Sequence, residues 1–342
     1  MTKPDANEVI WRDGALKLSL SPFVSDQWLD YVSGVWFGPR KRRYQRRNIR
    51  EQVARFENPR FLSLTYSGKL VGSYLLDLQS LALDDTPWCG VYRGLLSVDE
   101  TFRDRKLGAA IVDATLTWLH AFADEHPHPV MTYGCIDAAN ERSLALLASR
   151  GMNVLGELST QLKYRQFKKR RLPPIQLSDN LSTKARQQLV AGFTTPLLTE
   201  SDPGFGTWLT YDDGKHPPVA ARIACNVLNL APMKGVAGFV TETLMPWFPP
   251  GLKRFNPRHF RYVSVSDAVF ANDSPQLWDA FVEHLMVEHD CHFVAITLNH
   301  ANQAHGARIA ASGDSPDVVV VGRSISGELP TELAVRLAAR DL

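Results

Sequence analysis

Cysteine is scarce in this sequence, and paired cysteine motifs are missing. Cys89, Cys135, Cys225 and Cys291 are the only four cysteines, and no two of them form a C-x-x-C pair. Neither a disulfide framework nor a zinc ribbon is therefore indicated, and the isolated thiols suit a reducing compartment.

Long apolar runs are also missing. No hydrophobic stretch is long enough to span a bilayer, and the first residues, M-T-K-P-D-A-N-E, lack the apolar core of a signal peptide. We predict a soluble, cytoplasmic protein that has no membrane partner.

Charge of one sign is not in excess. The formal net charge is +2 over 342 residues, which gives no global field that would attract nucleic acid. Hydrophobic residues make up 44% of the chain, as in ordinary globular proteins, and the length predicts two domains.

The first half alternates between helical and strand patterns. Ser25 or Asp26 caps a helix with one apolar side, and the polar, basic segment 40–56 is interpreted as a second helix. A hairpin with Ser67-Gly68-Lys69 as its turn follows. The remaining patterns predict a strand over 91–98, a helix from Leu107, a strand over 130–136, a helix over 140–150 and a strand over 153–164.

The most informative stretch is V-D-E-T-F-R-D-R-K-L-G-A-A-I-V, residues 98–112. It is typical of a strand end, a basic turn that contains glycine, and the start of a helix. The first N–H groups of a helix have no internal partners and lie at the positive end of its dipole, so such a turn suits a pyrophosphate. A second segment, N-E-R-S-L-A-L-L-A-S-R-G-M, follows at residues 140–152.

Together the two segments resemble the signatures of the GNAT family of acyl-CoA-dependent N-acyltransferases, V-x-P-x-[YF]-R-x-x-G-x-[GA] and N-x-x-[AS]-x-x-[LF]-Y-x-x-x-G-[FM]. Glu100 replaces the common proline, Lys106 the first glycine and Leu147 the tyrosine. A register that begins the glycine motif at Arg105 and ends it at Ala110 also fits, but it does not use the first signature's valine and phenylalanine. The matching residues are Val98, Phe102, Arg103, Gly108, Asn140, Ser143, Leu146, Gly151 and Met152.

The resemblance covers residues 15–165 and implies an α/β (α+β) fold with a mixed sheet. It also implies that the pantetheine arm of acyl-CoA lies between two splayed central strands. The N–H of Leu96 would then point at the thioester carbonyl and that of Val98 at the pantetheine. The other implied cofactor-binding residues are Arg103, Asp104, Arg105, Lys106, Leu107, Gly108, Ala109, Asn140 and Ser143. No metal is implied.

The implied reaction is direct attack of an amine on the thioester, with the Leu96 N–H polarising the carbonyl. An alkyl amine with a pKa near ~10 must first lose a proton. The family's frequent base falls here at Tyr92 and its frequent acid at Leu147, and neither position keeps the usual residue.

Other residues are alternatives for these roles. Glu100, Asp99 and Asp137 are nearby carboxylates, although each also suits a solvated loop or a helix cap. Tyr92 and Tyr133 carry hydroxyl groups that suit protonation of a leaving thiolate, although strand tyrosines commonly belong to the core. We retain Tyr92, Tyr133 and Glu100 as catalytic candidates.

The second half weakly repeats the element order of the first. The charged, proline-containing segment 168–174 is interpreted as a linker between domains at 1–167 and 175–342. Helices over 185–193 and 277–287, and strands over 219–230, 260–270, 293–298 and 317–323, are predicted. We interpret this as a degenerate tandem GNAT copy, because the glycine turn is missing after Phe270. An unrelated α+β domain is the alternative.

Two basic clusters and one histidine-rich segment complete the candidates. The clusters at 40–50 and 163–171 suit an acidic acceptor, the 3′-phosphate of CoA or RNA, but solvated faces are favoured over nucleic acid. In the segment 282–292, His284 and Glu288 share a helix face, which an ordinary surface helix also explains.

The sequence therefore predicts transfer of an acyl group, most simply acetyl, from acyl-CoA to a small-molecule or peptide amine. A homodimer is left open. A non-catalytic acyl-CoA-binding scaffold and a carrier-dependent acyl or aminoacyl transferase are the alternatives.

Overall fold

A computed structural model describes residues 7–38, 43–164, 197–200, 207–211, 219–231, 257–269, 275–291, 293–298, 317–330 and 334–336. The predicted linker and the predicted helix over 185–193 lie outside these ranges. No helix within them is both long and apolar enough to cross a membrane.

The elements of the first half follow the predicted order, with a hairpin added at the start and the strand β3 added before α2. They are β1 (Glu8–Asp13), β2 (Leu16–Ser21), α1 (Asp26–Gly34), β3 (Tyr44–Arg46), α2 (Ile49–Val53), β4 (Pro59–Tyr66), β5 (Lys69–Leu83), β6 (Thr86–Val98), the 3₁₀ turn η1 (Glu100–Arg105), α3 (Leu107–Glu125), β7 (Val130–Asp137), α4 (Glu141–Ala148) and β8 (Asn153–Tyr164).

The second half contributes mainly strands. Its described elements are β9 (Leu197–Glu200), β10 (Thr207–Tyr211), β11 (Val219–Leu230), the 3₁₀ turn η4 (Pro257–His259), β12 (Phe260–Val269), α7 (Pro275–Glu288), β13 (Phe293–Leu298), β14 (Asp317–Ser324) and β15 (Ala334–Arg336).

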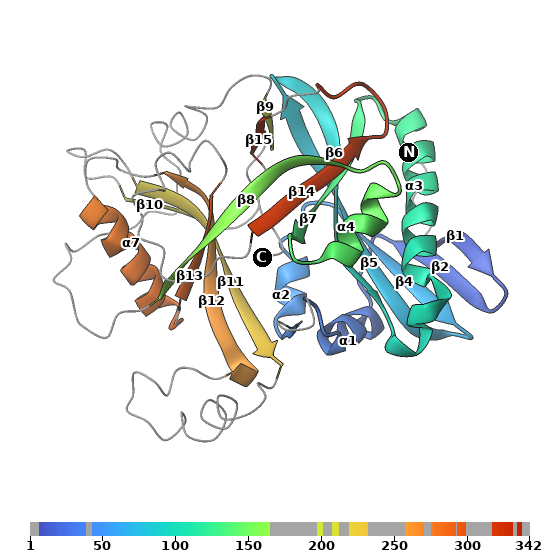
Figure 1. Cartoon of the computed structure of the whole chain (residues 1–342), viewed down its shortest axis with the longest axis horizontal. Coiled ribbons are helices and arrows are strands. Elements are labelled where there is room, and N and C mark those ends of the chain that lie inside the picture. Colours follow the sequence, from blue (N-terminus) through green and yellow to red (C-terminus); the bar gives the residue numbers. More distant parts are fainter. Residues whose placement is uncertain are drawn as a thin grey trace.

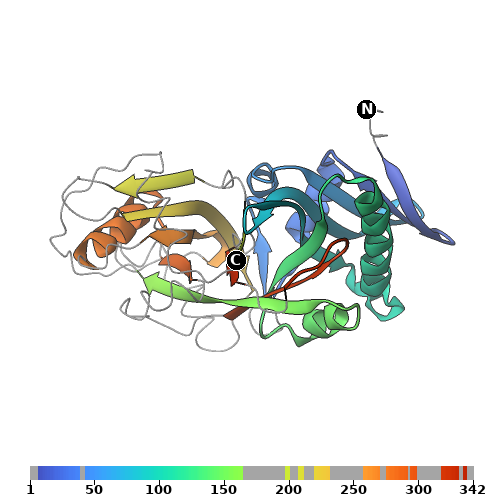
Figure 2. The same ribbon diagram turned by 90° about the horizontal axis from the view of Figure 1, so that it is seen from above.

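One mixed sheet runs through both halves (Figure 1). Its main strand order is β1-β2-β4-β5-β6-β7-β14-β8-β13-β12-β11-β10. Strand β8 joins the halves, because its first part pairs with β14 and its last part pairs with β13. Seen from above, β8 extends from one half of the molecule into the other (Figure 2).

The halves repeat one supersecondary unit. In the first half, the parallel strands β6 and β7 are connected through α3, and in the second half the parallel strands β12 and β13 are connected through α7. Each unit also has an antiparallel strand outside its second parallel strand, β14 beside β7 and β8 beside β13. The repeat inferred from the element order is therefore present in the sheet topology.

Strand β14 crosses the predicted domain division. The sequence assigns it to the second unit, yet it lies between β7 and β8 and pairs with Met131–Asp137 on one side. Residues 167–175, where the division was placed, lie outside the described ranges. The division into 1–167 and 175–342 stays a prediction. The hydrogen bonds of β14 place this strand in the sheet of the first half, although it belongs to the second half of the sequence.

The prediction of a helix over 40–56 is confirmed only for Ile49–Val53 and is wrong for residues 44–46. Residues 44–46 form β3, which pairs with the end of β11, and α2 is confined to Ile49–Val53. Basic side chains are compatible with a helix, but here the backbone bonds to a strand from the other half decide the local structure. The hairpin β1–β2 was not predicted.

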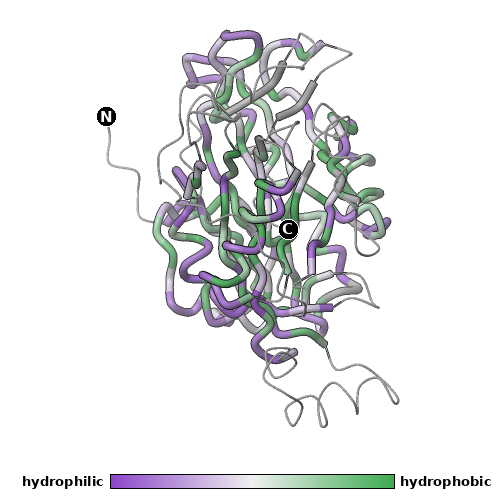
Figure 3. The backbone as a smooth tube through the Cα atoms, turned by 90° about the vertical axis from the view of Figure 1, so that its left-hand side faces the viewer, coloured by the Kyte–Doolittle hydropathy of each residue, from purple (hydrophilic) through white to green (hydrophobic). Residues whose placement is uncertain are grey.

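Apolar side chains cover both faces of the first half's sheet. One cluster places Trp28 and Val32 of α1 against the face that carries Tyr92, and the other places Ile111 and Leu119 of α3 against the opposite face. A third cluster packs α7 on the second half's sheet. In Figure 3, hydrophobic stretches of the backbone run through the middle of the molecule.

Candidate active site

The central strands β6 and β7 separate part of the way along. They pair only from Cys89 with Val130 to Tyr92 with Tyr133, although both strands continue beyond these residues. Past this point β7 keeps its other neighbour, β14. Residues 93–98 of β6 therefore form one wall of a V-shaped gap, as the resemblance implied for an acyl-CoA site.

A bulge in β6 shapes this wall. Between the pairs of Leu75 with Gly94 and of Ser73 with Ser97, two residues of β6 lie opposite one residue of β5. Leu95 has a left-handed φ of 56°, and the Ser73 hydroxyl donates to its carbonyl at 3.1 Å. Such bulges redirect the backbone beside functional sites.

The bulge is followed by N–H groups that point into the gap. The Asp99 N–H donates to the Val71 carbonyl at 2.8 Å, so it points toward β5. Because successive N–H groups of a strand point to opposite sides, that of Val98 points away from β5. The Leu95 carbonyl accepts from Ser73 of β5, so the Leu96 N–H on the other side of the same planar peptide also points away from β5. These are the two donors assigned to pantetheine and thioester from the sequence.

A cavity of about 370 Å³ occupies the gap and continues between the halves. Gly94 and Leu96 of β6, Cys135 and Asp137 of β7, and Leu147 of α4 contribute to its first-half wall. The second half adds Leu228, Tyr262 and Phe293. The cavity is therefore largely apolar, with a strand edge of hydrogen-bonding groups along one side.

The turn after β6 leads into the N-terminus of α3. Lys106 has the left-handed φ of 54°, and Leu107 begins the helix. The backbone N–H groups of Ala109 and Ala110 donate to the Lys106 carbonyl, and the first N–H groups of a helix have no acceptor within the helix itself. A Cβ on Gly108 would meet nothing within 4 Å. This helix end is therefore open to a ligand.

Arg105 is held beside this turn rather than over it. Its guanidinium lies 5.2 Å from the Phe102 ring centre and 5.9 Å from that of Tyr66. Arg103 and Asp104 belong to η1, but their side chains lie outside the described set. Val98 and the turn residues Arg105–Ala109 do not line the cavity. They come directly after the cavity-lining residues of β6 in the chain.

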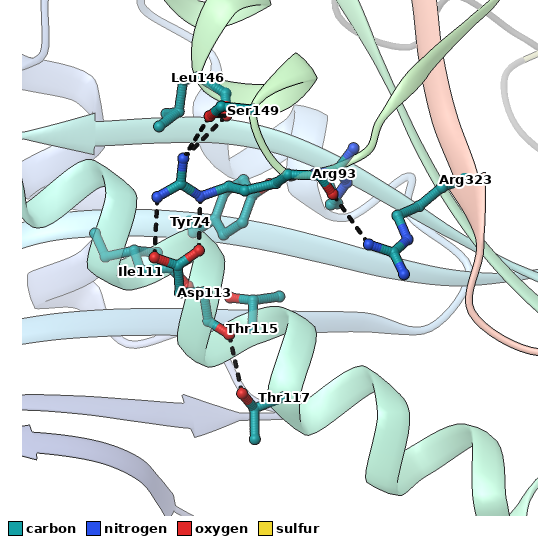
Figure 4. Close-up of polar contacts among 10 residues, drawn as sticks. Tyr74, Arg93, Ile111, Asp113, Thr115, Thr117, Leu146, Ser149 and Arg323 are labelled. Carbon is teal, nitrogen blue, oxygen red and sulfur yellow. Dashed lines mark hydrogen bonds and ion pairs between the residues drawn. The ribbon is translucent and has the colours of Figure 1, made fainter.

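Asn140 and Ser143 both line the cavity and also begin α4. The Asn140 side-chain oxygen accepts from the Ser143 N–H at 3.3 Å, which makes Asn140 the N-cap. The helix is anchored from two sides: Arg150 forms a two-pronged ion pair with Asp113 of α3, and Arg323 of β14 donates to the Arg150 carbonyl at 3.0 Å (Figure 4).

The three candidate catalytic side chains are placed outside the cavity lining. Tyr92 and Tyr133 are fully buried in the core, with ring centres 5.6 Å apart, and the Tyr133 hydroxyl donates to Gln79. Glu100 forms an exposed ion pair with Arg43 at 3.0 Å. Of the carboxylates considered, Asp137 lines the cavity, whereas Asp99 caps η1 by accepting from the Thr101 N–H.

Sequence reasoning missed two polar residues of the cavity wall, Tyr74 and Arg93. Arg93 is 5% exposed and Tyr74 is 3% exposed, and the Arg93 Nη1 donates to the Tyr74 hydroxyl oxygen at 3.4 Å. The Nε donor of Arg93 has no partner within the described residues. The sequence gives one sign of them: Tyr74 and Arg93 are polar residues on strands whose other positions are mainly buried.

The basic cluster at 40–50 is partly structural. Arg46 is 4% exposed, donates to Gln52 at 3.1 Å and lies 5.8 Å from the Tyr44 ring centre. Neutralising Arg46 would therefore disturb folding. The carrier-dependent alternative is tested on Arg43 and Arg47, because it predicts that their neutralisation abolishes activity while acyl-CoA binding stays intact. Arg42 lies outside the described residues.

The histidine-rich segment forms a surface ion pair. The His284 Nε2 lies 2.8 Å from the Glu288 Oε2, with 38% and 54% of these side chains exposed. Within the described residues, no group of three or more His, Cys, Asp or Glu side chains is placed to hold a metal.

Comparison with known proteins identifies the fold. Neither a protein-family model nor a curated protein matches the sequence. The structure is similar to Saccharomyces cerevisiae N-myristoyltransferase with bound myristoyl-CoA, with a TM-score of 0.55, 8% identity, and coverage of 92% of this chain and 84% of that chain. It is also similar to a tandem GNAT protein from the clavulanic acid biosynthesis pathway, with a TM-score of 0.52, 13% identity, and coverage of 91% of this chain and 99% of that chain.

The chain therefore has the fold of GNAT-type acyltransferases, with two copies of that fold in tandem. This confirms the fold class predicted from the motifs and the element order. At these identities the likeness establishes the architecture, and the chemistry has to be argued from the site.

Proposed function

We propose that the protein is an N-acyltransferase that transfers an acyl group, most simply acetyl, from acyl-CoA to an amine. The observation that carries this proposal is the splay of β6 and β7, with the N–H groups of Leu96 and Val98 on the side of the gap. A pantetheine arm is an extended chain with amide groups, so it can bond to this free edge as an added strand would.

The open N-terminus of α3 supports the same ligand. A pyrophosphate at Leu107 and Gly108 would lie at the positive end of the helix and receive backbone donors. The left-handed Lys106 turns the chain there, and its ammonium group adds a cation beside the phosphates. The residues present thus fit both ends of acyl-CoA.

The chemistry follows from the placement of these groups. The Leu96 N–H would donate to the thioester carbonyl as negative charge develops on its oxygen. Asp137 is the carboxylate at the cavity, and it would accept the amine's proton directly or through water. The second half would complete the acceptor side with Leu228, Tyr262 and Phe293, so the acceptor would enter between the halves.

The test is release of free CoA thiol from acetyl-CoA and longer acyl-CoAs in the presence of a panel of small amines and peptides. Acyl transfer to an amine, verified by the mass of the product, is the expected result. Binding of acyl-CoA with no transfer to any acceptor would instead support the scaffold alternative. The order of rates among the donors would give the acyl chain length.

A further inference from the structure

We propose that Tyr74 is the acid that protonates the leaving CoA sulfur, with Arg93 as the residue that positions and supports it. This inference rests on the proposed function. It assigns a role to two residues that the sequence motifs do not include.

The first step is the hydrogen-bond direction between the two residues. Arginine has no acceptor, so in the 3.4 Å contact the Arg93 Nη1 donates and the Tyr74 oxygen accepts. The Tyr74 proton is therefore left for another acceptor. None is found for it among the described residues, and the hydroxyl belongs to a cavity-lining side chain.

The second step is position. Tyr74 lies at the point of β5 where the bulge places Leu95 and Leu96 opposite a single residue. Cross-strand neighbours are within side-chain reach of each other. The acid is therefore beside the residue whose N–H is assigned to the thioester carbonyl, and sulfur is bonded to that carbonyl carbon. Leu147, at the position where the resembled family frequently has its acid, lines the same cavity but has no proton to donate.

The other two tyrosines of the cavity lining are less well placed. Tyr44 lies on β3 and Tyr262 on β12, and neither strand pairs with β6, whereas β5 pairs with it along its length. Tyr262 is also stacked on Phe293, with ring centres 5.1 Å apart. Tyr74 alone among these three adjoins the bulge.

The third step is electrostatic. Arg93 is a buried cation whose Nε has no partner in the described part of the chain, an arrangement that favours a negative charge close by. Burial raises the pKa of Tyr74, and the nearby charge and hydrogen bond of Arg93 act in the opposite direction. The phenol is thus held protonated at neutral pH, and its anion has a cation beside it.

The proton balance closes without an additional reactant. The amine nitrogen forms a bond to the carbonyl carbon, the C–S bond breaks, and its electron pair stays on sulfur. Tyr74 gives its proton to the sulfur, which yields the free thiol. The tyrosinate beside Arg93 then regains a proton from solvent, and Asp137 passes to solvent the proton that it took from the attacking amine.

The experiment compares Tyr74→Phe with a matched control, Tyr31→Phe. Both changes remove one hydroxyl and keep the ring, and the Tyr31 hydroxyl donates to the Val71 carbonyl outside the cavity. Tyr74→Phe should lower kcat with acetyl-CoA by about 10²-fold, with the KM for acetyl-CoA and the thermal stabilisation by free CoA unchanged. Tyr31→Phe should keep kcat. If Tyr74→Phe keeps kcat within about twofold, far short of the general-acid effect, the inference is overturned while the proposed function stands. No turnover by the unchanged protein overturns both.

A second set of measurements, on Arg93, includes one that does not depend on turnover. Tyr74 ionisation can be followed by NMR of ring-labelled tyrosine, with the signal assigned from its loss in Tyr74→Phe. Arg93→Met removes the cation and should raise the pKa of Tyr74 further, while Arg93→Lys should restore part of the kcat that Arg93→Met loses. An unchanged Tyr74 titration in Arg93→Met would contradict the coupling.

Discussion

Single residues in this protein carry conformations that their side chains do not favour. Lys106 occupies the left-handed region at the start of α3, where the GNAT signature has glycine. A side chain in that region costs about 1–2 kcal/mol relative to right-handed backbone. The resemblance between sequence and motif therefore extends to backbone geometry, even though the residue differs.

This conformation predicts a difference between two variants of Lys106. Both Lys106→Gly and Lys106→Ala lose the ammonium group, but only glycine adopts the left-handed turn without a steric penalty. Lys106→Gly should be more stable than Lys106→Ala by roughly 1 kcal/mol, measured from the midpoints of urea unfolding. Equal stability of the two variants would show that the turn is not left-handed in solution.

Gln52 shows how one buried amide can link the two halves. Its Nε2 donates to Asn48 at 3.0 Å and to Asn226 of β11 at 3.1 Å, and its Oε1 accepts from Arg46 at 3.1 Å. Gln52→Ala should lower the free energy of unfolding by roughly 2–4 kcal/mol, because polar partners lose bonds without gaining water. Gln27→Ala on the exposed side of α1 is the matched control, and an equal effect of both changes would contradict this role.

At the scale of elements, what the sequence could predict depends on how local the cause is. The hairpin at Ser67-Gly68 and the helix α3 are local patterns that were predicted, and the cap at Ser25 is one of the two residues predicted for it. Strand β3 depends on β11, about 180 residues away, where Asn229 pairs with Gln45. No local pattern could reveal that partner.

The candidate site divides in the same way. The backbone donors Leu96 and Val98 and the turn at Gly108 were predicted because a motif marks them. Tyr74 and Arg93 were missed because β5 and β6 bring them together only once the bulge has formed. Tyr92 and Tyr133 were considered because of their chemistry, and the alternation of the strands placed them in the core instead.

The place of β14 between β7 and β8 leads to a prediction about Gly322. A Cβ there would lie 2.7 Å from the Thr132 carbonyl oxygen and 2.6 Å from the Leu155 Cδ1, so alanine would force β14 away from β7 and β8. Gly322→Ala should cost roughly 1–3 kcal/mol and increase amide hydrogen exchange in β7 and in the first part of β8.

Gly34→Ala in α1 is the control for this experiment, because a Cβ there meets nothing within 4 Å. If Gly322→Ala leaves exchange in β7 unaltered, β14 does not occupy the place in the first half's sheet that the pairing gives it.

At the scale of the whole molecule, the two copies of the fold are not equivalent. The first copy has the splay, the bulge and the open helix end, and the second contributes Leu228, Tyr262 and Phe293 to the same cavity. Strand pairing between the copies explains why residues of both line one cavity. Strand β8 of the first copy pairs with β13 of the second, and β14 from the second half of the sequence pairs with β7 of the first copy. Under the proposed function, the second copy therefore shapes the acceptor side.

The most direct test of the acyl-CoA site is a thermal-shift titration with acetyl-CoA and free CoA on the unchanged protein, Gly108→Ala and Gly108→Asp. Both substitutions enter open space, and a carboxylate in the first turn of a helix is compatible with its dipole, so all three proteins should fold. A ligand at a hundred times its Kd stabilises by about 2.7 kcal/mol.

The unchanged protein and Gly108→Ala should show this stabilisation. Gly108→Asp should bind about tenfold more weakly or worse, a loss of ~1.4 kcal/mol or more, because its carboxylate would face the pyrophosphate. No shift in the unchanged protein, or an equal shift in all three proteins, would contradict the placement of acyl-CoA at the splay and the N-terminus of α3.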